Sequence, residues 1–301
     1  MANALIKKKR KKISIGQAAL HIFFIALCLC YILPFILLIS VSFEGSPSQY
    51  FSLFPKVFST DAYEMILARP QRILKAYGVT FFYSITSVAG SLIIMSMFAY
   101  ALSKRDFVFR GFLTFLLFFT TLFGGGMVSS YLVNTQILHL GNSIWIYIFP
   151  TLLNAWNVIV IRTFFQGLPQ ELYDAARIDG ASELRVCFQI IIPLSTSVLA
   201  SVGFLSFIDH WNNWNISQIY IRDPDLYSLQ YLLKIILDSE EQLKLMMESG
   251  FTVGADAEEQ LSNLESMRFA MAVVAAGPMC FVFPFFQKYF AKGMTLGSVK
   301  G

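Results

Sequence analysis

The chain has 301 residues, of which 56% are hydrophobic and only 14% are charged. A soluble domain ordinarily carries about a quarter of its residues as charges, so this composition excludes an ordinary soluble protein and predicts a chain that lies mostly in lipid. The net charge of +4 is small, and the main basic run, residues 7–12, directly precedes an apolar segment. Nucleic-acid binding is therefore not expected.

Apolar segments long enough to cross a membrane recur along the chain. A spanning helix needs about 20 mostly apolar residues, because every backbone polar group must be bonded within the segment. The expected spans are residues 18–41, 79–102, 111–133, 144–165, 189–209 and 268–290. The sequence therefore predicts an all-α membrane protein with six transmembrane helices, made of a basic arm (residues 1–17) and one transmembrane domain (residues 18–301).

The first apolar segment follows a basic region, as in a secretory signal peptide. It is too long for the apolar part of such a peptide, and no small-x-small cleavage motif follows it. We interpret it as an uncleaved signal-anchor helix.

Proline and glycine mark places where the spans deviate from straight helices. Proline is tolerated within a membrane helix where neighbours satisfy the freed carbonyl, so each proline within a span predicts a kink. These prolines are Pro34, Pro150, Pro193, Pro278 and Pro284. Three consecutive glycines at 124–126 predict that the outer half of the third span unwinds or re-enters.

The distribution of Lys and Arg predicts the orientation. With the N-terminus in the cytoplasm, most basic residues fall in cytoplasmic segments, as the positive-inside rule requires. Both termini are then cytoplasmic, and two long loops, about 43–78 and 210–267, lie outside. The second loop has an amphipathic helical pattern followed by an acidic stretch, which suits either contact with a soluble partner or a solvated excursion. The apolar positions of that pattern are Leu229, Leu232, Leu233, Ile236 and Leu237.

The connection between the fourth and fifth spans, about 167–188, has the pattern of two short helices joined by a turn. Pro169 is well placed to begin a helix, and Glu171 favours its positively polarised end. Gly180 is expected to end this helix in a left-handed conformation. A second helix then starts near Ser182 and runs toward the membrane.

Small and charged residues alternate around this turn. The alanines, 175, 176 and 181, are expected to form one small-residue face, with Asp174, Arg177 and Asp179 beside it. A projection of this size buries little apolar surface by itself, so it is suited to a groove on another protein.

This segment resembles the EAA loop of ABC importer permeases, whose pattern in sugar permeases is EAA-x-x-DGA followed by a proline twelve residues later. Residues 174–176 take the EAA place, residues 179–181 match DGA, and Pro193 has the expected spacing. Asp174 replaces the usual Glu and keeps its charge, and Cys187 stands where Phe is common. Further likeness to carbohydrate-uptake permeases lies in residues 125–131, 142–145, 161–165, 210–214 and 284–290.

The resemblance implies a permease subunit of the maltose-type, complex-oligosaccharide family, with the ABC type I importer fold, in a bacterial plasma membrane. It implies that the loop docks in a cytoplasmic ATPase and carries the movement of that ATPase into an alternating-access cycle. The residues that it assigns to coupling are Glu171, Asp174, Ala175, Ala176, Asp179, Gly180 and Ala181.

The implied partners are a second permease, two ABC ATPase subunits and an extracellular sugar-binding protein. The chain has no G-x-x-x-x-G-K-[ST] sequence, which is the phosphate-binding loop of ATPases. ATP and Mg are therefore expected on the partner ATPase, and this chain is expected to be non-catalytic and to bind no cofactor or metal.

Aromatic and amide side chains bind sugars, and two groups of them are candidates for the substrate pathway: Trp211, Asn212, Asn213 and Trp214 after the fifth span, and Asn154 and Asn157 in the fourth. The alternative for each is an aromatic belt residue or an amide that bonds another helix.

The main functional alternative is an ion-coupled secondary transporter. Such transporters commonly place Asp, Glu or His within their spans, and the spans expected here hold almost none. A membrane enzyme or an ion channel would need a clustered polar site or a selectivity filter, and neither pattern is present.

Overall fold

The computed structural model describes residues 15–45, 53–249 and 256–297. Regular structure in these ranges is helical, apart from one isolated antiparallel bridge between Glu44 and Phe58. This confirms the all-α prediction. The basic run 7–12 lies outside the described residues.

Three single helices are long and apolar enough to cross a membrane: α1 (Ile15–Ser42), α3 (Pro70–Ser103) and α14 (Ala257–Gly297). At 1.5 Å per residue, α3 is about 51 Å long and α14 about 62 Å, against a hydrocarbon core of about 30 Å. The second and last spans were predicted to begin at 79 and 268. Each of these predicted spans lies within its helix, and both helices start about ten residues before the span.

The other three predicted spans are pairs of helices with a bend between them. Helix α4 (Arg110–Leu122) meets the segment that starts with α5 (Gly126–Leu132) at an angle of 116°. The segment formed by α6 (Trp145–Ile148) and η2 (Phe149–Thr151) meets α7 (Ala155–Gln166) at 47°. The segment from Glu183 to Leu194 meets α11 (Thr196–Trp211) at 81°. The predicted spans 111–133, 144–165 and 189–209 each correspond to one of these bent pairs, and the sequence predicted a kink or an unwound half in each of them.

Each bend has a local cause. Gly126 has a positive φ of 78°, which confirms the predicted unwinding at the triple glycine. Pro150 and Pro193 lie just before the other two bends, where they remove a backbone donor. By contrast, α1 continues through Pro34, and α14 continues through Pro278 and Pro284.

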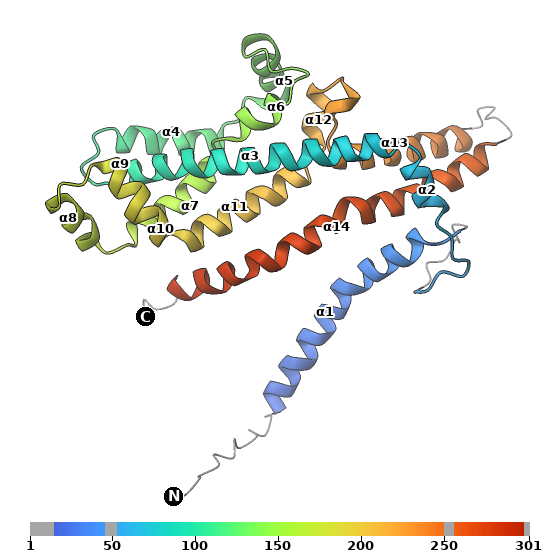
Figure 1. The fold of residues 1–301 in the computed structure, drawn as a ribbon, viewed down its shortest axis with the longest axis horizontal. Helices are drawn as coiled ribbons and strands as arrows, with labels where there is room; N and C mark the ends of the chain where they lie inside the picture. Colours follow the sequence, from blue (N-terminus) through green and yellow to red (C-terminus); the bar gives the residue numbers. More distant parts are fainter. Residues whose placement is uncertain (1–14, 46–52, 250–255, 298–301) are drawn as a thin grey trace, which may run out of the picture.

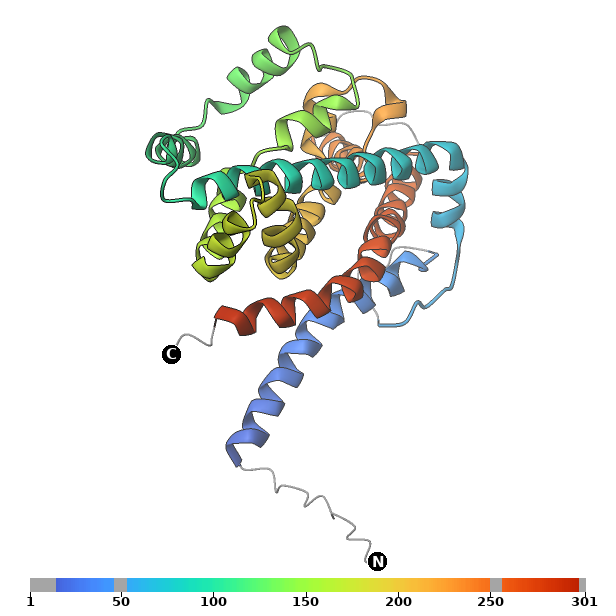
Figure 2. The same ribbon diagram turned by 60° about the vertical axis from the view of Figure 1, so that its left-hand side comes forward.

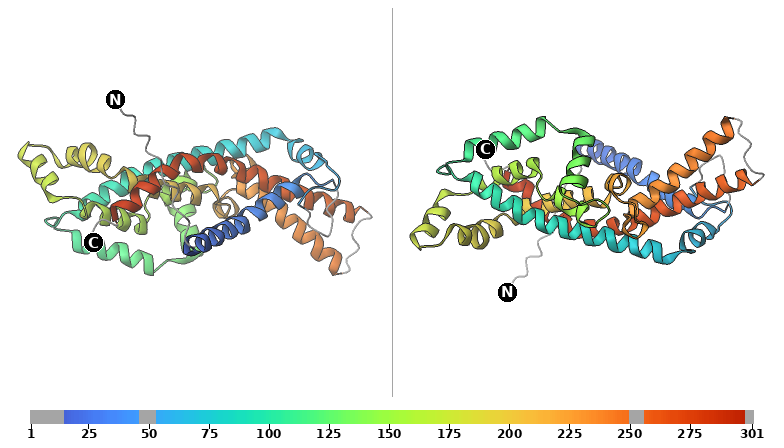
Figure 3. Two further views of the ribbon diagram at one scale, coloured as in Figure 1. Left: turned by 90° about the horizontal axis from the view of Figure 1, so that it is seen from below. Right: turned by 90° about the horizontal axis from the view of Figure 1, so that it is seen from above.

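The remaining elements are short, except one. They are α2 (Asp61–Leu67), η1 (Val133–Ile137), α8 (Gln170–Ile178), α9 (Glu183–Val186), η3 (Cys187–Ile191), α10 (Ile192–Leu194), α12 (Asn215–Tyr220), η4 (Pro224–Leu226) and α13 (Leu229–Glu248). Helix α13 carries the predicted amphipathic pattern, with Leu229 and Leu232 buried. It forms a hairpin with the first part of α14 (Figure 3).

Helix α3 runs along the length of the molecule, with α7 and α11 packed beside it and α14 packed against α11 (Figure 1). Helices α8 and α9 lie at one end, and the α13–α14 hairpin lies at the other. Helix α1 packs against α14 near its own C-terminal end and diverges from the other helices toward its N-terminal end (Figures 1 and 2).

Small polar residues allow close packing along α3. Thr80, Ser84, Ser87 and Ser91 follow a helical spacing and are all buried. Small residues let membrane helices approach each other closely without a clash. This face places α3 at the centre of the bundle.

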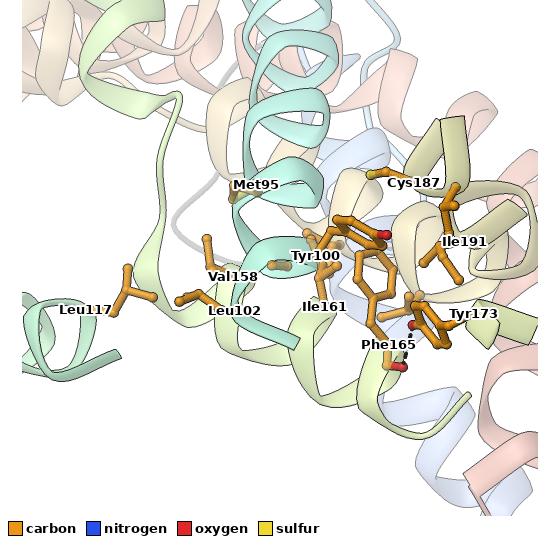
Figure 4. Packing of buried hydrophobic residues seen from close by; sticks show 14 of the residues in the cluster. Met95, Tyr100, Leu102, Leu117, Val158, Ile161, Phe165, Tyr173, Cys187 and Ile191 are labelled. Carbon is orange, nitrogen blue, oxygen red and sulfur yellow. Dashed lines mark hydrogen bonds between the residues drawn. The ribbon is translucent and has the colours of Figure 1, made fainter. Parts of the chain in front are cut away.

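Two main hydrophobic clusters lie at opposite ends of α3. The first joins α3, α7, α8, η3 and α11 around Leu102, Ile161 and Ile191 (Figure 4). The second joins α3, α11, α13 and α14 around Trp211 and Met271. The first cluster supports the candidate site described below.

Candidate coupling site at the α8 end

The turn after α8 has the predicted conformation. Gly180 has a φ of +71°, the left-handed conformation that glycine adopts without a steric penalty. The chain then closes back on α8, because the N–H of Ala181 donates to the carbonyl of Ala176 at 3.0 Å. The hydroxyl of Ser182 accepts from the N–H of Arg185 at 3.4 Å and caps α9. The predicted helix, turn and second helix are therefore present.

The second helix differs from its prediction. It was expected to continue from Ser182 into the membrane, but the segment ends at Leu194 and the chain turns by 81° into α11. The bend follows Pro193.

Helix α8 has an inner and an outer face. Tyr173 and Ala176 are three residues apart on the inner face and are buried in the first cluster, and the Tyr173 hydroxyl donates to the carbonyl of Phe165 at 3.1 Å (Figure 4). The outer face is formed by exposed residues: Glu171, Asp174, Ala175, Ile178 and Asp179. Ile178 is 86% exposed and is the one large apolar side chain on this outer face.

The predicted small-residue face needs correction. Ala175 is exposed, whereas Ala176 is buried and Ala181 packs against the first cluster. Consecutive residues on a helix point about 100° apart, so the two neighbouring alanines cannot share one face. Ala176 and Ala181 hold α8 on this chain, and only Ala175 is available to another protein.

Glu183 is the centre of a polar network that joins this segment to α3. Its carboxylate accepts a hydrogen bond from the Tyr100 hydroxyl, at the end of α3. Arg177, in the last turn of α8, donates to it from Nε at 3.2 Å and from Nη2 at 3.1 Å. Lys104, directly after α3, places its Nζ 3.4 Å from the same carboxylate.

Lys104 is the most enclosed charge in the network, with its side chain only 12% exposed. Its Nζ lies 4.2 Å from the ring centre of Tyr173 and 4.7 Å from that of Tyr100, distances typical of cation–π contacts. Burial lowers the pKa of its ammonium group, and the Glu183 carboxylate opposes that shift. Lys104 therefore connects α3 to α8 through an ion pair and two rings.

Arg177 also binds the connection between α3 and α4, since its Nη2 lies 3.1 Å from the Asp106 carboxylate. A backbone hydrogen bond of its own and then the bond from Arg177 hold the pKa of Asp106 below its usual value. Hydrogen bonds to Glu183 and Asp106 raise the pKa of Arg177. The α8 turn is thus attached to α3 and to the segment that follows α3.

Sequence reasoning did not find this network. Tyr100, Lys104 and Asp106 lie about 80 residues before Glu183 in the chain, and no spacing rule connects them. The sequence carried one weak signal of this network. The second span ends in an aromatic residue and a cation, Tyr100 and Lys104, and the loop between the fourth and fifth spans contains Glu183, to which no role was assigned.

Trp211, predicted to line the substrate pathway, is a packing residue in this structure. Its side chain is fully buried within the second cluster, in contact with the rings of Phe81 and Phe207. Its Nε1 donates to the carbonyl of Ala275 at 3.0 Å. Neither its ring nor its N–H is open to a sugar.

The amide candidates are also used within the chain. The Asn154 oxygen accepts from the N–H of Asn157 at 3.1 Å and caps α7, while the Asn157 side chain donates to Ser206 of α11 at 3.2 Å. The Asn213 oxygen accepts from the N–H of Ile216 at 3.0 Å. The alternative stated for these residues, an amide that bonds another helix, describes Asn157, whereas Asn213 makes a local bond three residues along the chain.

Two candidates after α11 keep exposed surface. Asn212 is exposed and accepts from Gln230 at 3.4 Å. Trp214 is 37% exposed, with the Nζ of Lys234 5.3 Å from its ring centre. Among the described residues, neither Asn212 nor Trp214 makes a hydrogen bond or ring contact with Asn154.

Comparison with known proteins adds the family. The family model described as "binding-protein-dependent transport system inner membrane component" matches residues 65–296. The polygalacturonan/rhamnogalacturonan transport system permease protein YtcP of Bacillus subtilis (strain 168) is 38% identical over 93% of this chain and 96% of that protein. The arabinooligosaccharides transport system permease protein AraQ of Halalkalibacterium halodurans is 29% identical over 97% of this chain and 100% of that protein.

A solved structure has the same fold. A chain of a bacterial ABC transporter involved in the import of the acidic polysaccharide alginate superposes with a TM-score of 0.76 and 27% identity, covering 92% of this chain and 98% of its own. With a family model that covers most of its length and relatives at this identity, the chain belongs to the inner-membrane permease components of binding-protein-dependent transport systems.

Proposed function

We propose that this chain is one of two permease subunits of an ATP-driven importer for oligosaccharides and that α8 with the Gly180 turn is its coupling element. The proposal includes six spans, three of them bent, the ABC type I importer fold, and both termini in the cytoplasm. The observation that carries it is the α8 turn, which has an exposed outer face and a network that attaches its inner face to α3.

Family membership decides between the alternatives raised by the sequence. Permease components of this family are non-catalytic, multi-pass proteins of the bacterial plasma membrane. The ion-coupled secondary transporter is therefore set aside. We propose that ATP and Mg bind to a separate ATPase that drives this chain.

The substrate class rests on the relatives. The named relatives transport polygalacturonan or rhamnogalacturonan and arabinooligosaccharides, and the solved transporter imports alginate. Their common chemistry is a chain of several sugar units, so we propose an oligosaccharide delivered by an extracellular binding protein. Two of the three carry acidic sugars, which makes uronic-acid oligomers the first ligands to test.

Coupling requires a surface for the ATPase and a rigid attachment to the spans. The exposed residues Glu171, Asp174, Ala175, Ile178 and Asp179 provide an acidic rim around one apolar side chain. Such a surface suits a cleft that has an apolar floor and basic edges. Gly180 lets the chain leave this surface without a side chain at its tip.

The attachment is the network around Glu183. A displacement of α8 caused by ATPase closure moves Arg177 and Tyr173. Arg177 is bonded to Glu183, which also binds Tyr100 at the end of α3, and the ring of Tyr173 contacts Lys104 directly. Because α3 packs against α7, α11 and α13 and its Tyr77 hydroxyl donates to the carbonyl of Val274 on α14, it distributes this displacement through the bundle. Individual exposed ion pairs contribute about 0–1 kcal/mol each, so the aromatic contacts to Lys104 and the buried face of α8 supply most of the rigidity.

The opposite end suits the binding protein. The α13–α14 hairpin extends past the length that a membrane requires, and its exposed surface is acidic. We assign it to contact with the extracellular partner. Asn154, Asn212 and Trp214, which keep exposed surface, stay as candidates for the substrate pathway.

The decisive experiment is a gentle detergent pull-down of the tagged chain from native membranes, with mass spectrometry and an ATPase assay of the eluate. We expect a second permease, a P-loop ATPase and ATP hydrolysis. Gly180→Trp places a bulky ring at the exposed tip and should release the ATPase while leaving the second permease bound. Recovery of the chain without any ATPase from wild-type membranes would contradict the proposal.

A further inference from the structure

A hollow of about 630 Å³ lies between α8 and the connection from α3 to α4. Its charged lining consists of four cations and one carboxylate: Lys104, Arg105, Arg110, Arg177 and Asp106. The carboxylate is already bonded to Arg177 at 3.1 Å. Lys104 and Arg177 also pair with the Glu183 carboxylate, so the excess of positive charge in the hollow comes from Arg105 and Arg110.

Two of these cations have no counter-ion. Arg105 and Arg110 take part in none of the ion pairs among the described residues, and all Asp and Glu residues of the chain lie within the described ranges. The Gln166 amide is oriented so that its oxygen faces donors and its nitrogen faces acceptors. In this orientation the oxygen accepts hydrogen bonds from Arg110 Nη2 at 3.0 Å and from Arg162 Nε at 3.2 Å. Two guanidinium groups thus share one neutral oxygen, an arrangement that an anion stabilises.

An apolar groove of about 440 Å³ adjoins the hollow. The two share Lys104, Asp106 and Arg177 in their linings, and the groove continues along Met97 and Ala101. Met97, Ala101 and Lys104 are four and three residues apart, so they form one face of α3. A charged hollow that opens onto an apolar groove fits an anionic molecule with a hydrocarbon chain.

The position favours a lipid as the source of that anion. Lys104 directly follows α3 and Arg110 is the first residue of α4, so the hollow lies where two membrane helices reach the interface. Basic pockets between helices at the cytoplasmic interface bind the head groups of anionic lipids.

We propose that this hollow binds the head-group phosphate of an anionic phospholipid and that the adjoining groove holds part of an acyl chain. The proposal rests on the orientation given under the proposed function. Because Lys104 and Arg177 belong both to the hollow and to the network that holds α8, a bound lipid stabilises the attachment of the coupling element to α3.

The test uses the complete complex with its second permease and ATPase, purified in mild detergent with equal amounts of phosphatidylglycerol and phosphatidylcholine. Native mass spectrometry measures the retained lipids. We expect the wild type to retain phosphatidylglycerol preferentially, and the double variant Arg105→Gln/Arg110→Gln to retain about tenfold less. Arg105→Gln alone, at an exposed side chain, is expected to give a smaller loss without disturbing the fold.

Arg185→Gln is the matched control. Arg185 is an exposed cation of the nearby α9, donates to Gln189 at 3.0 Å and does not line the hollow. This variant is expected to retain phosphatidylglycerol as the wild type does. Equal loss in the control and the double variant, or no loss in the double variant, overturns the proposal.

Two further arms identify the occupant. In the first arm, inorganic phosphate is added in excess. If it displaces phosphatidylglycerol completely, the hollow recognises only the phosphate group, and the lipid assignment is overturned. In the second arm, the ATPase is removed from the complex. If phosphatidylglycerol is retained only after this removal, an acidic surface of the ATPase fills the hollow in the complex, and the lipid assignment is again overturned. ATPase recovery in the same samples tests the proposed function separately, because loss of the ATPase from the wild type contradicts that function whatever the lipid result.

Discussion

Arg268 of α14 donates two hydrogen bonds to the carboxylate of Glu240 on α13, at 2.7 and 2.9 Å. Glu240 is only 3% exposed, and Lys244 also binds it at 2.7 Å. Lys244 in turn lies 2.8 Å from Glu265 of α14. This cluster crosses between the two helices of the outer hairpin and fixes their relative position.

We predict that Glu240→Ala destabilises the hairpin by about 2 kcal/mol, because it leaves Arg268 and Lys244 without their shared acceptor. The cost stays below that of a fully buried pair, since both cations reach water. The measurement is thermal unfolding of the purified complex in detergent. Glu241→Ala, at an exposed neighbour with no ion pair among the described residues, is the control. An equal change in Tm for both variants would contradict the assignment.

A second prediction concerns the backbone at Gly180. A Cβ added there meets no atom within 4 Å, but the φ of +71° is unfavourable for alanine, at about 1–2 kcal/mol. Gly180→Ala should therefore reach the membrane at normal levels and reduce uptake. Gly111→Ala adds a Cβ to equally open space without a positive φ, and uptake by this variant should be unchanged. If both variants transport alike, the left-handed turn is not needed for coupling.

How far the sequence predicts the structure depends on the distance over which its signals act. The turn at Gly180 and the amphipathic α13 follow from residues within one or two helical turns, and both were predicted correctly. The bends after Leu122, Thr151 and Leu194 were anticipated only as kinks or an unwound half. A glycine or proline permits a bend, but packing against other helices sets its angle.

The residues that face the interior were harder to predict, for a physical reason. In a membrane protein the lipid side is as apolar as the core, so hydrophobicity does not separate the two faces of a span. Trp211 was therefore assigned to the substrate pathway although it is buried, and Ala176 to a docking surface although it packs inward. The Glu183 network joins segments about 80 residues apart, and a single sequence carries no signal of that pairing.

The burial of Trp211 leads to a third prediction. Trp211→Ala removes a fully enclosed indole and leaves the Ala275 carbonyl without its donor, at a cost of about 3–5 kcal/mol. The amount of protein in the membrane and the uptake rate should then fall in the same proportion. Trp214→Ala, at a partly exposed side chain, should leave the amount unchanged. The measurement compares the uptake rate with the amount of protein in the membrane, determined by immunoblot. If Trp211→Ala loses uptake while its protein level stays normal, Trp211 belongs to the substrate pathway after all.

The last prediction separates coupling from assembly. Glu183→Gln keeps the shape of the side chain but removes the charge that attracts Lys104 and Arg177. The α8 surface that faces the ATPase is untouched, so the ATPase should copurify and hydrolyse ATP. The movement of α8 that follows ATP hydrolysis is then transmitted to α3 less completely. We therefore expect the amount of sugar taken up per ATP hydrolysed, measured in proteoliposomes, to fall several-fold.

Tyr100→Phe supports this test, because it removes only the hydroxyl that donates to Glu183 and retains the ring that contacts Lys104. It should lower the ratio of uptake to hydrolysis in the same direction by a smaller amount. Arg185→Gln, at a neighbouring exposed charge outside the network, should leave the ratio at the wild-type value. If uptake and hydrolysis fall together in Glu183→Gln, the residue supports folding or docking, and the transmission of movement from α8 to α3 must follow the buried contacts of Tyr173 and Ala176.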